Sequence, residues 1–567
     1  MIPYYEEDVP PPTDDDVPAF AEPSHPISDS EPDIVPNTAL DRATTRAADL
    51  SLIPINRLEP FKVIEAGWKA IEDANRSPWV FRRGSHIVLI GEQADGTPTM
   101  EPCGTPEVQG ILLRVARWVR MRDGGMTPVE PPRMVAADMV AFPSKTLPQL
   151  DAVTRSPVFD ATTGRPRLVN RPGYDPKSRL LYSPARDFME PFVPDRPTDR
   201  QVATALDLLL HRWLGDFPFE SPADRTHALA LALLPSVRRL IRGPTPLHLA
   251  EAAERGTGKS LLVKLALAPS LGTLPEPATY SRDPEEVRKK ITSLLLAGRR
   301  AVFLDNLEGQ IDSPDLAAVL TSERWEDRVL GASTMTQLPN EAVWAASGNN
   351  CELSTDIARR TVRFRLNRNM ERPWEWKGAR IKNIETWTME NRRHLLGAIL
   401  TLIQSWVAAG AKLSDHHLGS FESWAATIGG ILTHLEQPGF LSNLNQMYEQ
   451  ADTSQTEWRA FVLQWWNERG TDACSAGTLA DIADGNGMLA SVLGSANSER
   501  AKAIRVGRAL TKQRDRVISG LKMTMRTEHN QTVYALVAVE GAPPREKPAP
   551  RRPAYSGYPP PPTDDDR

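Results

Sequence analysis

The sequence predicts an α/β fold organised around a parallel sheet, and three observations from its central part indicate this. A short apolar segment that starts at Leu247 runs through a tight glycine turn into an apolar helical stretch, the order of a strand, a loop and a helix. Two later apolar runs, 300–306 and 342–350, have the length of buried strands and end in polar residues. Residues 283–296 have helical spacing, with Pro284 at the start and acids in the first turn.

Length and composition limit the number of folded units and the kinds of site that the chain can have. The chain has 567 residues, room for roughly three or four units. Its three cysteines lie far apart, with no neighbouring histidines at zinc-ligand spacing, so we expect neither a structural zinc nor disulfides. The N-terminus lacks the basic and apolar regions of a signal peptide, and no apolar run reaches the ~20 residues of a membrane span. We therefore expect a cytoplasmic protein with no membrane partner.

Both ends of the chain, 1–58 and 541–567, are Pro-rich and polar, and we expect them to be disordered tails. Residues 1–41 hold eleven acids and no Lys or Arg; taking these away from a net charge of −5 leaves the remainder at +6. The sequence Pro-Pro-Pro-Thr-Asp-Asp-Asp occurs at 10–16 and again at 560–566. The two copies are either matched docking peptides, for a host single-stranded-DNA-binding protein or primase, or solvating low-complexity segments.

The first folded segment, 59–195, has a mixed pattern and is predicted to be an accessory α+β domain. Residues 79–90 form two short strands around a glycine turn, and 105–121 have helical spacing with several arginines. No cluster of carboxylates has catalytic spacing in this segment. Its role is left open.

A helical collar is predicted at 196–243, directly before the first strand of the sheet. Its apolar faces include 207–214 and 228–240. His211 and His227 lie on these helices, but neither has a second ligand four residues away. We expect packed or surface histidines, not metal ligands.

The glycine turn is followed by Lys and Ser, the composition of a phosphate-binding loop. Its residues are Gly256, Thr257, Gly258, Lys259 and Ser260. Neither glycine has a Cβ to block the approach of backbone N–H groups to a phosphate; Lys259 would reach the β- and γ-phosphates of ATP, and the Ser260 hydroxyl would bind Mg²⁺. The complete phosphate-loop pattern, GxxxxGK(S/T), has glycine at the position where this chain has Ala253. A glycine turn that only caps a helix is the alternative.

The polar ends of the two later strands supply partners for this loop. Asp305 ends the first of them, where a Mg²⁺ ligand beside a phosphate loop belongs. Asn306 could orient the attacking water but cannot accept its proton, so Glu308 is a substitute base. Asn349 ends the second strand and is suited to hydrogen-bond the γ-phosphate or the water.

Arg359 and Arg360 follow a short helix after the last of these strands. They either pair with acids on their own surface or act as an arginine finger that reaches the ATP of a neighbouring subunit. Four motifs occur in order within about 110 residues: the glycine turn, the Asp-Asn pair, the single Asn and the Arg pair. This order favours nucleotide hydrolysis.

The order of these motifs resembles that of superfamily 3 helicases of the AAA+ class, especially the replicative helicase modules of plasmids, prophages and poxvirus-type primase-helicases. The resemblance covers about residues 196–540. It implies an ATPase core at 244–375, a helical lid at 376–453, a homo-hexameric ring with ATP between subunits, and 3′→5′ movement on single-stranded DNA. Such proteins often carry a primase before the ring, but 59–195 shows no primase carboxylate pattern.

The family places a hairpin in the ring channel, and here it would be formed by 325–339 with Gly331 in its turn. Arg328, Ser333 and Thr334 are its candidate phosphate contacts. Family members often carry Lys or His at the tip, and this chain does not. A plain surface hairpin is the alternative.

Residues 454–540 have the pattern of a winged helix: three helical segments and an alternating pair of strands around a polar turn. On the third segment, 498–512, one face is expected to hold Ala503, Ile504, Gly507 and Leu510. The basic face holds Arg505, Arg508 and Lys512. This face either contacts DNA phosphates or is merely solvated.

The sequence therefore predicts an ATP-dependent replicative DNA helicase of a plasmid or phage, acting on single-stranded and forked DNA. The alternative in another class is an ATP-switched DNA-binding initiator or helicase-loading factor that does not unwind. A third is a non-enzymatic scaffold whose acidic ends recruit host replication proteins. The choice of the first rests on family analogy more than on residue chemistry.

Overall fold

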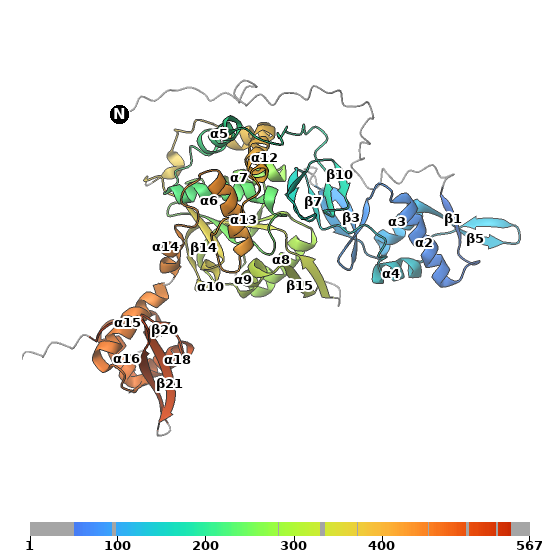
Figure 1. The fold of residues 1–567 in the computed structure, drawn as a ribbon. Coiled ribbons are helices and arrows are strands. Elements are labelled where there is room, and N and C mark those ends of the chain that lie inside the picture. The colour runs from blue at the N-terminus through green and yellow to red at the C-terminus, as the bar shows by residue number, and fades with distance from the viewer. Residues whose placement is uncertain are drawn as a thin grey trace, which may run out of the picture. The chain divides into compact units, whose positions relative to one another are not determined.

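The computed structural model describes residues 50–92, 98–281, 283–328, 335–370, 372–451, 453–494, 498–528 and 531–545 (Figure 1). The chain divides into two compact units, one ending at Tyr448 and the other beginning at Glu449. Residues 1–49 and 546–567, with both copies of the repeated heptapeptide, lie outside the described residues. The predicted disorder of 1–58 is wrong for its last part, because Ser51–Pro54 forms a strand, β1, that pairs with another strand. No helix in the described ranges is both long and apolar enough to cross a membrane.

A five-stranded parallel sheet forms the centre of the first unit. In spatial order its strands are β13 (Pro277–Thr279), β14 (Ala301–Ile311), β17 (Val343–Leu353), β12 (Leu247–Ala252) and β18 (Thr361–Leu366). Every residue of β12 is buried, as expected of a strand covered on both faces. The predicted α/β class with a parallel sheet is therefore confirmed.

Helices cover this sheet in two layers. α7 (Lys259–Leu271) follows the glycine turn and packs on β12, β14 and β17, while α6 (Pro222–Val237) packs on α7 and β18. α12 (Arg392–Ala408) contacts both and forms the outer layer. Because α6 and α7 are buried on nearly all sides, they are apolar around most of their circumference.

Two strands run further than the sequence predicts. β14 continues past Asn306 to Ile311, and β17 continues past Asn350 to Leu353, with the last pair formed by these two end residues. The prediction that both strands end at their polar residues is wrong. A register shift between Leu304 and Leu307 places Asp305 and Asn306 in a β-bulge, and pairing resumes beyond it.

The remaining elements of the first unit lie before, between and after these. They are β1 (Ser51–Pro54), α2 (Pro60–Ala74), β2 (Val80–Arg83), β3 (His86–Glu92), β4 (Pro98–Pro102), α3 (Thr105–Val115), β5 (Ala116–Arg122), β6 (Gly125–Pro128), α4 (Arg133–Ala141), β7 (Ala152–Thr154), β8 (Val158–Asp160), β9 (Arg167–Val169), β10 (Gly173–Asp175), β11 (Leu180–Tyr182), α5 (Asp199–Asp207), the π-helical turn η2 (Leu208–Trp213), α8 (Pro284–Leu296), α9 (Pro314–Thr321), β15 (Arg324–Arg328), β16 (Met335–Pro339), α10 (Thr355–Ala358), the 3₁₀ turn η3 (Pro373–Glu375), α11 (Ile384–Glu390), α13 (Glu422–His434) and α14 (Leu444–Ala451).

The helix expected at 105–121 ends early. α3 stops at Val115, and β5 begins at once and pairs in parallel with β1. Ala116 and Trp118 turn into the core while Arg117 between them is exposed, an alternation that suits a strand. Tertiary pairing with β1 therefore overrides the helical spacing of the arginines.

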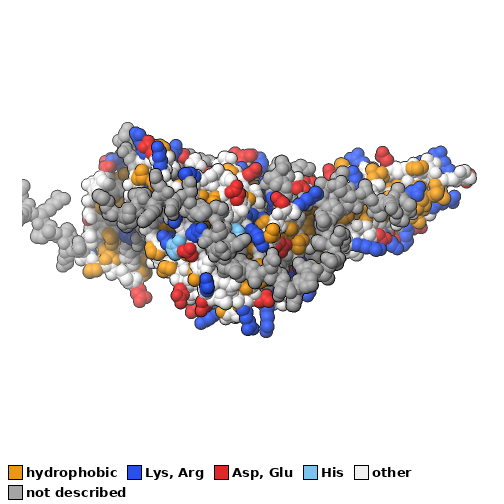
Figure 2. All heavy atoms as spheres, turned by 90° about the horizontal axis from the view of Figure 1, so that it is seen from above, with side chains coloured by type: hydrophobic (Ala, Val, Ile, Leu, Met, Phe, Trp, Pro, Cys, Tyr) orange, Lys and Arg blue, Asp and Glu red, His pale blue; other side chains and the backbone are white. Residues whose placement is uncertain are grey.

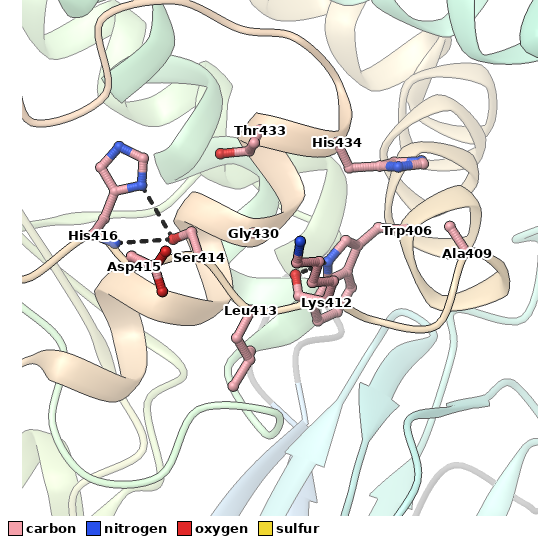
Figure 3. Close-up of a pocket in the computed structure, with 10 residues that line it drawn as sticks. All are labelled: Trp406, Ala409, Lys412, Leu413, Ser414, Asp415, His416, Gly430, Thr433 and His434. Atoms are coloured by element: carbon pink, nitrogen blue, oxygen red, sulfur yellow. Dashed lines mark hydrogen bonds between the residues drawn. The ribbon is translucent and has the colours of Figure 1, made fainter.

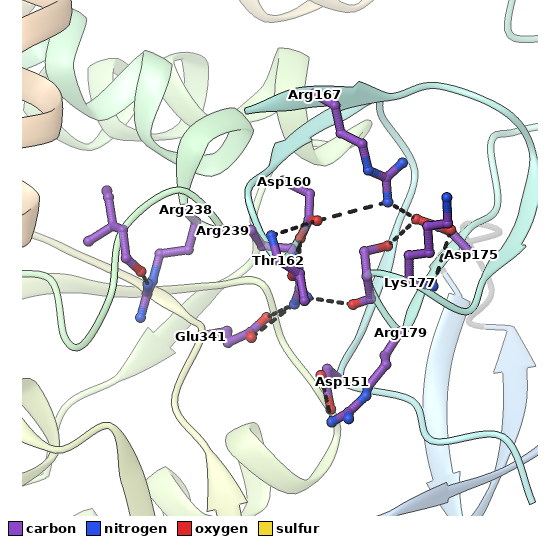
Figure 4. Close-up of polar contacts among 12 residues, drawn as sticks. Asp151, Asp160, Thr162, Arg167, Asp175, Lys177, Arg179, Arg238, Arg239 and Glu341 are labelled. Carbon is purple, nitrogen blue, oxygen red and sulfur yellow. Dashed lines mark hydrogen bonds and ion pairs between the residues drawn. The ribbon is translucent and has the colours of Figure 1, made fainter. Parts of the chain in front are cut away.

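Buried arginines join the N-terminal segments to the sheet unit (Figure 4). Arg239, just after α6, donates to Asp160 of β8 (3.1 Å) and to both carboxylate oxygens of Glu341 (2.8 and 2.9 Å), which precedes β17. Arg83 of β2 donates to the carbonyl of Leu295 near the end of α8 (2.7 Å). The segments before α5 are thus held to the core by charge-assisted hydrogen bonds. The predicted boundaries at 58, 195, 243, 375 and 453 stay predictions.

The two histidines of the predicted collar are packed or at the surface, as expected. His227 is fully buried; its Nδ1 bonds the Arg363 carbonyl (2.9 Å) and its Nε2 accepts from the Leu441 N–H (3.0 Å). His211 is exposed and bonds Asp207 (3.1 Å).

The second unit is a small α+β module. Its helices are α15 (Thr453–Arg469), α16 (Ala476–Gly485), α17 (Ala490–Leu493) and α18 (Glu499–Lys512), and its antiparallel sheet has the order β19 (Cys474–Ser475), β22 (Gln531–Ala538), β21 (Leu521–Glu528), β20 (Val517–Ile518). Trp465, Leu479 and Val506 lie in its core. The apolar face expected on α18 needs one correction: Val506 and Leu510 are buried, whereas Ile504 is 48% exposed.

Acid should destabilise this fold through His248 of β12. Its ring is buried, packs edge-on against Trp424, and has a pKa lowered by burial from 6.5 to about 3. Between these values the unfolded chain binds the proton and the folded chain does not, so the free energy of unfolding falls as pH drops below 6.5. At pH 5.5 this group alone should cost about 1.4 kcal/mol.

Urea unfolding at pH 7.5 and 5.5 measures this loss. His248→Leu should reduce the difference between the two pH values, whereas the control His211→Leu, at an exposed site, should leave it unchanged. Equal pH dependence in wild type and His248→Leu would contradict the assignment.

Candidate functional site

The glycine turn lies between the carboxyl end of β12 and the first turn of α7. Gly256 and Gly258 have φ values of 76° and 93°, a region that side chains with a Cβ rarely adopt. A Cβ at Gly256 would also lie 2.8 Å from the Cβ of Trp374. β12 has β17 on one side and β18 on the other, although the chain visits β13 and β14 first. Ligands of open α/β sheets bind at such a switch point, outside the carboxyl ends of the strands.

Three oxygen-bearing side chains meet beside this turn. Ser260 Oγ, in the first turn of α7, donates to Asp305 Oδ1 at 2.6 Å and lies 3.0 Å from Ser347 Oγ. Ser347, in β17, also donates to Asp305 Oδ1. The structure thus brings Ser260 and Asp305 together, as the sequence predicts. The sequence assigns no role to Ser347, because only the sheet register shows that its side chain faces this point.

Lys259 is the first residue of α7 and is 7% exposed. Burial lowers the pKa of its ammonium group, and the nearby Asp305 carboxylate opposes that shift. A buried cation beside a helix N-terminus favours an arriving anion, because the anion restores the stability of the charged form.

Asn306 sits in the bulge of β14 with φ of 56°. Its backbone N–H donates to Asp305 Oδ1 (2.9 Å), and its side-chain amide donates to Glu308 Oε1 (3.3 Å). The same Glu308 oxygen accepts from Arg255 (2.9 Å). The carboxylate suggested as a substitute base is therefore engaged by two donors.

Asn349 lies beside the carboxyl end of β12, where it is the register partner of Ala252. Its Oδ1 atom is buried and has no hydrogen-bond partner in the part of the chain that the structure describes. Buried acceptors without a donor are uncommon, so this oxygen is available to a ligand or a water molecule.

A buried ion pair lies between β12 and β18, next to the site, and the sequence did not predict it. Glu251 of β12 is 4% exposed; its carboxylate accepts from Arg363 of β18 (3.1 Å) and from the Cys351 N–H (3.0 Å), and Arg365 lies 3.5 Å away. Burial lowers the pKa of Arg363, and Glu251 opposes the shift. The available signal was an acid inside an apolar strand and two arginines at alternate positions of another.

Arg359 and Arg360 follow α10 and both pair with Asp356 of the same chain. Arg359 Nη2 lies 3.3 Å from Asp356 Oδ1. Arg360 Nη1 pairs with the same carboxylate and also donates to the Asp356 carbonyl oxygen at 2.6 Å. Within one chain, the pair therefore has the contacts of the self-paired alternative.

The candidate DNA contacts are placed in part. β15 and β16 form the predicted antiparallel hairpin, anchored to α8 by Asp327, which accepts from Arg288 (3.0 Å) and Thr292 (2.6 Å). Arg328 ends β15, while Ser333 and Thr334 lie outside the described residues.

On α18 the two arginines of the predicted basic face are exposed. Arg505 donates to the Leu493 carbonyl (2.5 Å), and Arg508 makes no ion pair within the described residues. Lys512 ends the helix.

A cavity of about 610 Å³ lies elsewhere, between α12, α13 and the segment joining them (Figure 3). Lys412, Ser414, His416 and His434 are among its lining residues, and Ser414 Oγ lies 3.1 Å from His416 Nδ1. None of the residues around the glycine turn lines it. The cavity is therefore separate from the cluster of Ser260, Asp305 and Ser347.

No family model matches this chain, and no curated protein matches it. Among solved structures, the chain is similar to the apo C-terminal region of NrS-1, with 10% identity, a TM-score of 0.36, and coverage of 81% of this chain and 95% of that one. It is also similar to the SCCmec type IV Cch active helicase (11%, 0.32, 80% and 91%) and to JCV helicase bound to a small molecule (14%, 0.19, 45% and 72%).

Removing Glu251 should destabilise the sheet. Glu251→Leu leaves Arg363 buried without its carboxylate, which should cost about 3–5 kcal/mol in the free energy of unfolding. The double variant Glu251→Leu/Arg363→Met removes both charges and should lose less than either single variant. Urea unfolding of the three variants measures the coupling; additive losses would contradict a stabilising pair.

Proposed function

We propose that the protein hydrolyses ATP at the glycine turn and uses the energy to move on DNA as a helicase. One observation supports the ATPase part: Ser260 Oγ and Asp305 Oδ1 are 2.6 Å apart at the carboxyl edge of the sheet. Ser260 directly follows a turn that contains two glycines with positive φ and a buried lysine. Loop N–H groups and the N-terminus of α7 would bind the β-phosphate, and Lys259 would bind the β- and γ-phosphates.

The residues present fit Mg²⁺. Ser260 and Asp305 supply hydroxyl and carboxylate oxygens that reach one point, and Mg²⁺ in nucleotide sites commonly uses one or two carboxylates together with phosphates and water. Bound there, the ion would neutralise charge that develops on the phosphates. Ser347 orients Asp305, and the unpartnered Oδ1 of Asn349 can accept a hydrogen bond from the attacking water.

The DNA part of the proposal rests on the motif order that resembles superfamily 3 helicases. That resemblance favours a homo-hexamer in which Arg360 turns from Asp356 to the ATP of the adjoining subunit. The hairpin β15–β16 and the exposed arginines of α18, in a unit with the helix and hairpin content of a winged helix, are the proposed contacts to single-stranded and forked DNA.

A second function is favoured by one observation. The position after Asp305 is an asparagine, and the nearest alternative base, Glu308, is held by Arg255 and Asn306. Slow hydrolysis would suit an ATP-switched initiator or loading factor, which binds DNA without unwinding it. ATP turnover that DNA stimulates, together with strand separation, distinguishes the helicase from this alternative.

Lys259→Ala should reduce DNA-stimulated ATP hydrolysis and unwinding of a forked duplex to background, because the variant loses the only cation proposed to bind the β- and γ-phosphates from within the loop. Lys264→Ala, also on α7 but paired with Glu385 (3.7 Å), is the matched control and should retain both activities. Unwinding by Lys259→Ala would overturn the site; turnover without unwinding in the wild type would favour the initiator.

Arg360→Ala should lower the rate constant for ATP hydrolysis by about 10³–10⁵-fold if the arginine acts on a neighbouring subunit's ATP. In mixtures with wild type, activity should then fall faster than the fraction of variant rises. A strictly linear decrease would indicate that Arg360 acts only within its own chain.

A further inference from the structure

The hairpin β5–β6 is a basic ribbon that no part of the proposed ATPase uses. Its strand β5 carries Arg117, Arg120 and Arg122, all exposed. None of these three makes an ion pair or a side-chain hydrogen bond among the described residues, and the one acid of the turn is Asp123. Unpaired arginines in a cluster favour a polyanionic partner, because like charges held close together repel one another until an anion binds.

The geometry of the hairpin leaves it free to enter a groove. β1 pairs with β5 only as far as Val119, so from Arg120 to Arg122 the hairpin continues as two strands. A Cβ placed on Gly124 or on Gly125 at the tip would meet no atom within 4 Å. In Figure 1 the β5 hairpin extends beyond α2 and α4, and Figure 2 shows Lys and Arg side chains interspersed with hydrophobic ones on this part of the first unit.

The base of the ribbon is held firmly. Asn56, just after β1, donates to the Met121 carbonyl (2.8 Å) and accepts from the Met121 N–H (2.9 Å). Trp118 is buried at the foot of β5, and its indole donates to the Leu112 carbonyl (2.8 Å). Arg57 follows Asn56, is also exposed, and makes no ion pair with any residue that the structure describes. It adds a further positive charge beside the ribbon.

We propose that the β5–β6 ribbon binds duplex DNA, with Arg120 and Arg122 contacting backbone phosphates. The two side chains lie on one face of the strand, about 7 Å apart along it. The major groove of duplex DNA is wide enough to admit a two-stranded ribbon, whereas a single strand offers no such groove. The ribbon has no exposed aromatic ring on which the bases of a single strand could stack. This inference is independent of ATP hydrolysis, because binding is measured without nucleotide.

The test uses the full chain and a labelled 20-base-pair duplex, with a single strand of the same length as the second probe. Arg120→Ala/Arg122→Ala should weaken duplex binding by about tenfold or more, because two contacts to backbone phosphates are lost. It should also reduce the slope of log affinity against log salt by about 1.8, because each phosphate contact contributes about 0.9. Affinity for the single strand should change little.

The matched control is Lys69→Ala/Arg76→Ala, which removes two exposed, unpaired charges from α2 and the turn after it. It should leave duplex affinity and the salt slope unchanged. Unchanged ATP hydrolysis without DNA and an unchanged circular dichroism spectrum verify that the hairpin variant folds. Duplex affinity that the hairpin variant does not alter, or that the control lowers equally, would overturn the proposal. So would an equal loss of affinity for the single strand.

Discussion

The hydrogen bond between Ser260 and Asp305 depends on the register of three strands. The two residues are 45 positions apart. Ser260 begins the helix that follows β12, and Asp305 lies in β14, while β12 and β14 are not neighbours in the sheet. β17 lies between them and supplies Ser347, which contacts both. Parallel strands bring their carboxyl ends to one edge, and the bulge in β14 turns Asp305 towards that edge. A slip of one residue in any of these pairings would separate the three side chains.

Beneath this cluster, buried polar groups make the sheet rigid at the cost of desolvation. Glu251 is satisfied by Arg363 and by a backbone N–H, so that each charged group has a partner in the low-dielectric interior. Asn349 differs, because its buried Oδ1 has no hydrogen-bond partner among the described residues. A site that holds its donors and an acceptor in place before the ligand arrives needs little reorganisation during the reaction. The same argument applies to Lys259. Burial lowers the pKa of its ammonium group, and an anion bound nearby would stabilise the charged form.

The N-terminal segments are joined to this core through Arg239 and Arg83, yet β5 and β6 extend away from it. The first unit therefore combines the proposed nucleotide site with an exposed basic ribbon, and the second unit presents basic residues of its own on α18. Each of these basic surfaces is on an element that packs against the core of its own unit.

Local pattern was sufficient for much of this molecule. The α/β class, the helix that begins at Lys259, the helix 283–296 and the strands around Asp305 and Asn349 all follow from apolar periodicity and from the chemistry of glycine and proline at turns. Tertiary structure decided the rest. The lengths of β14 and β17, the conversion of 116–122 from helix to strand, the position of Ser347 and the pairing of Glu251 with Arg363 depend on neighbours distant in the chain. Periodicity reports which face of an element is apolar, but only strand pairing determines which polar side chains from different elements reach the same point.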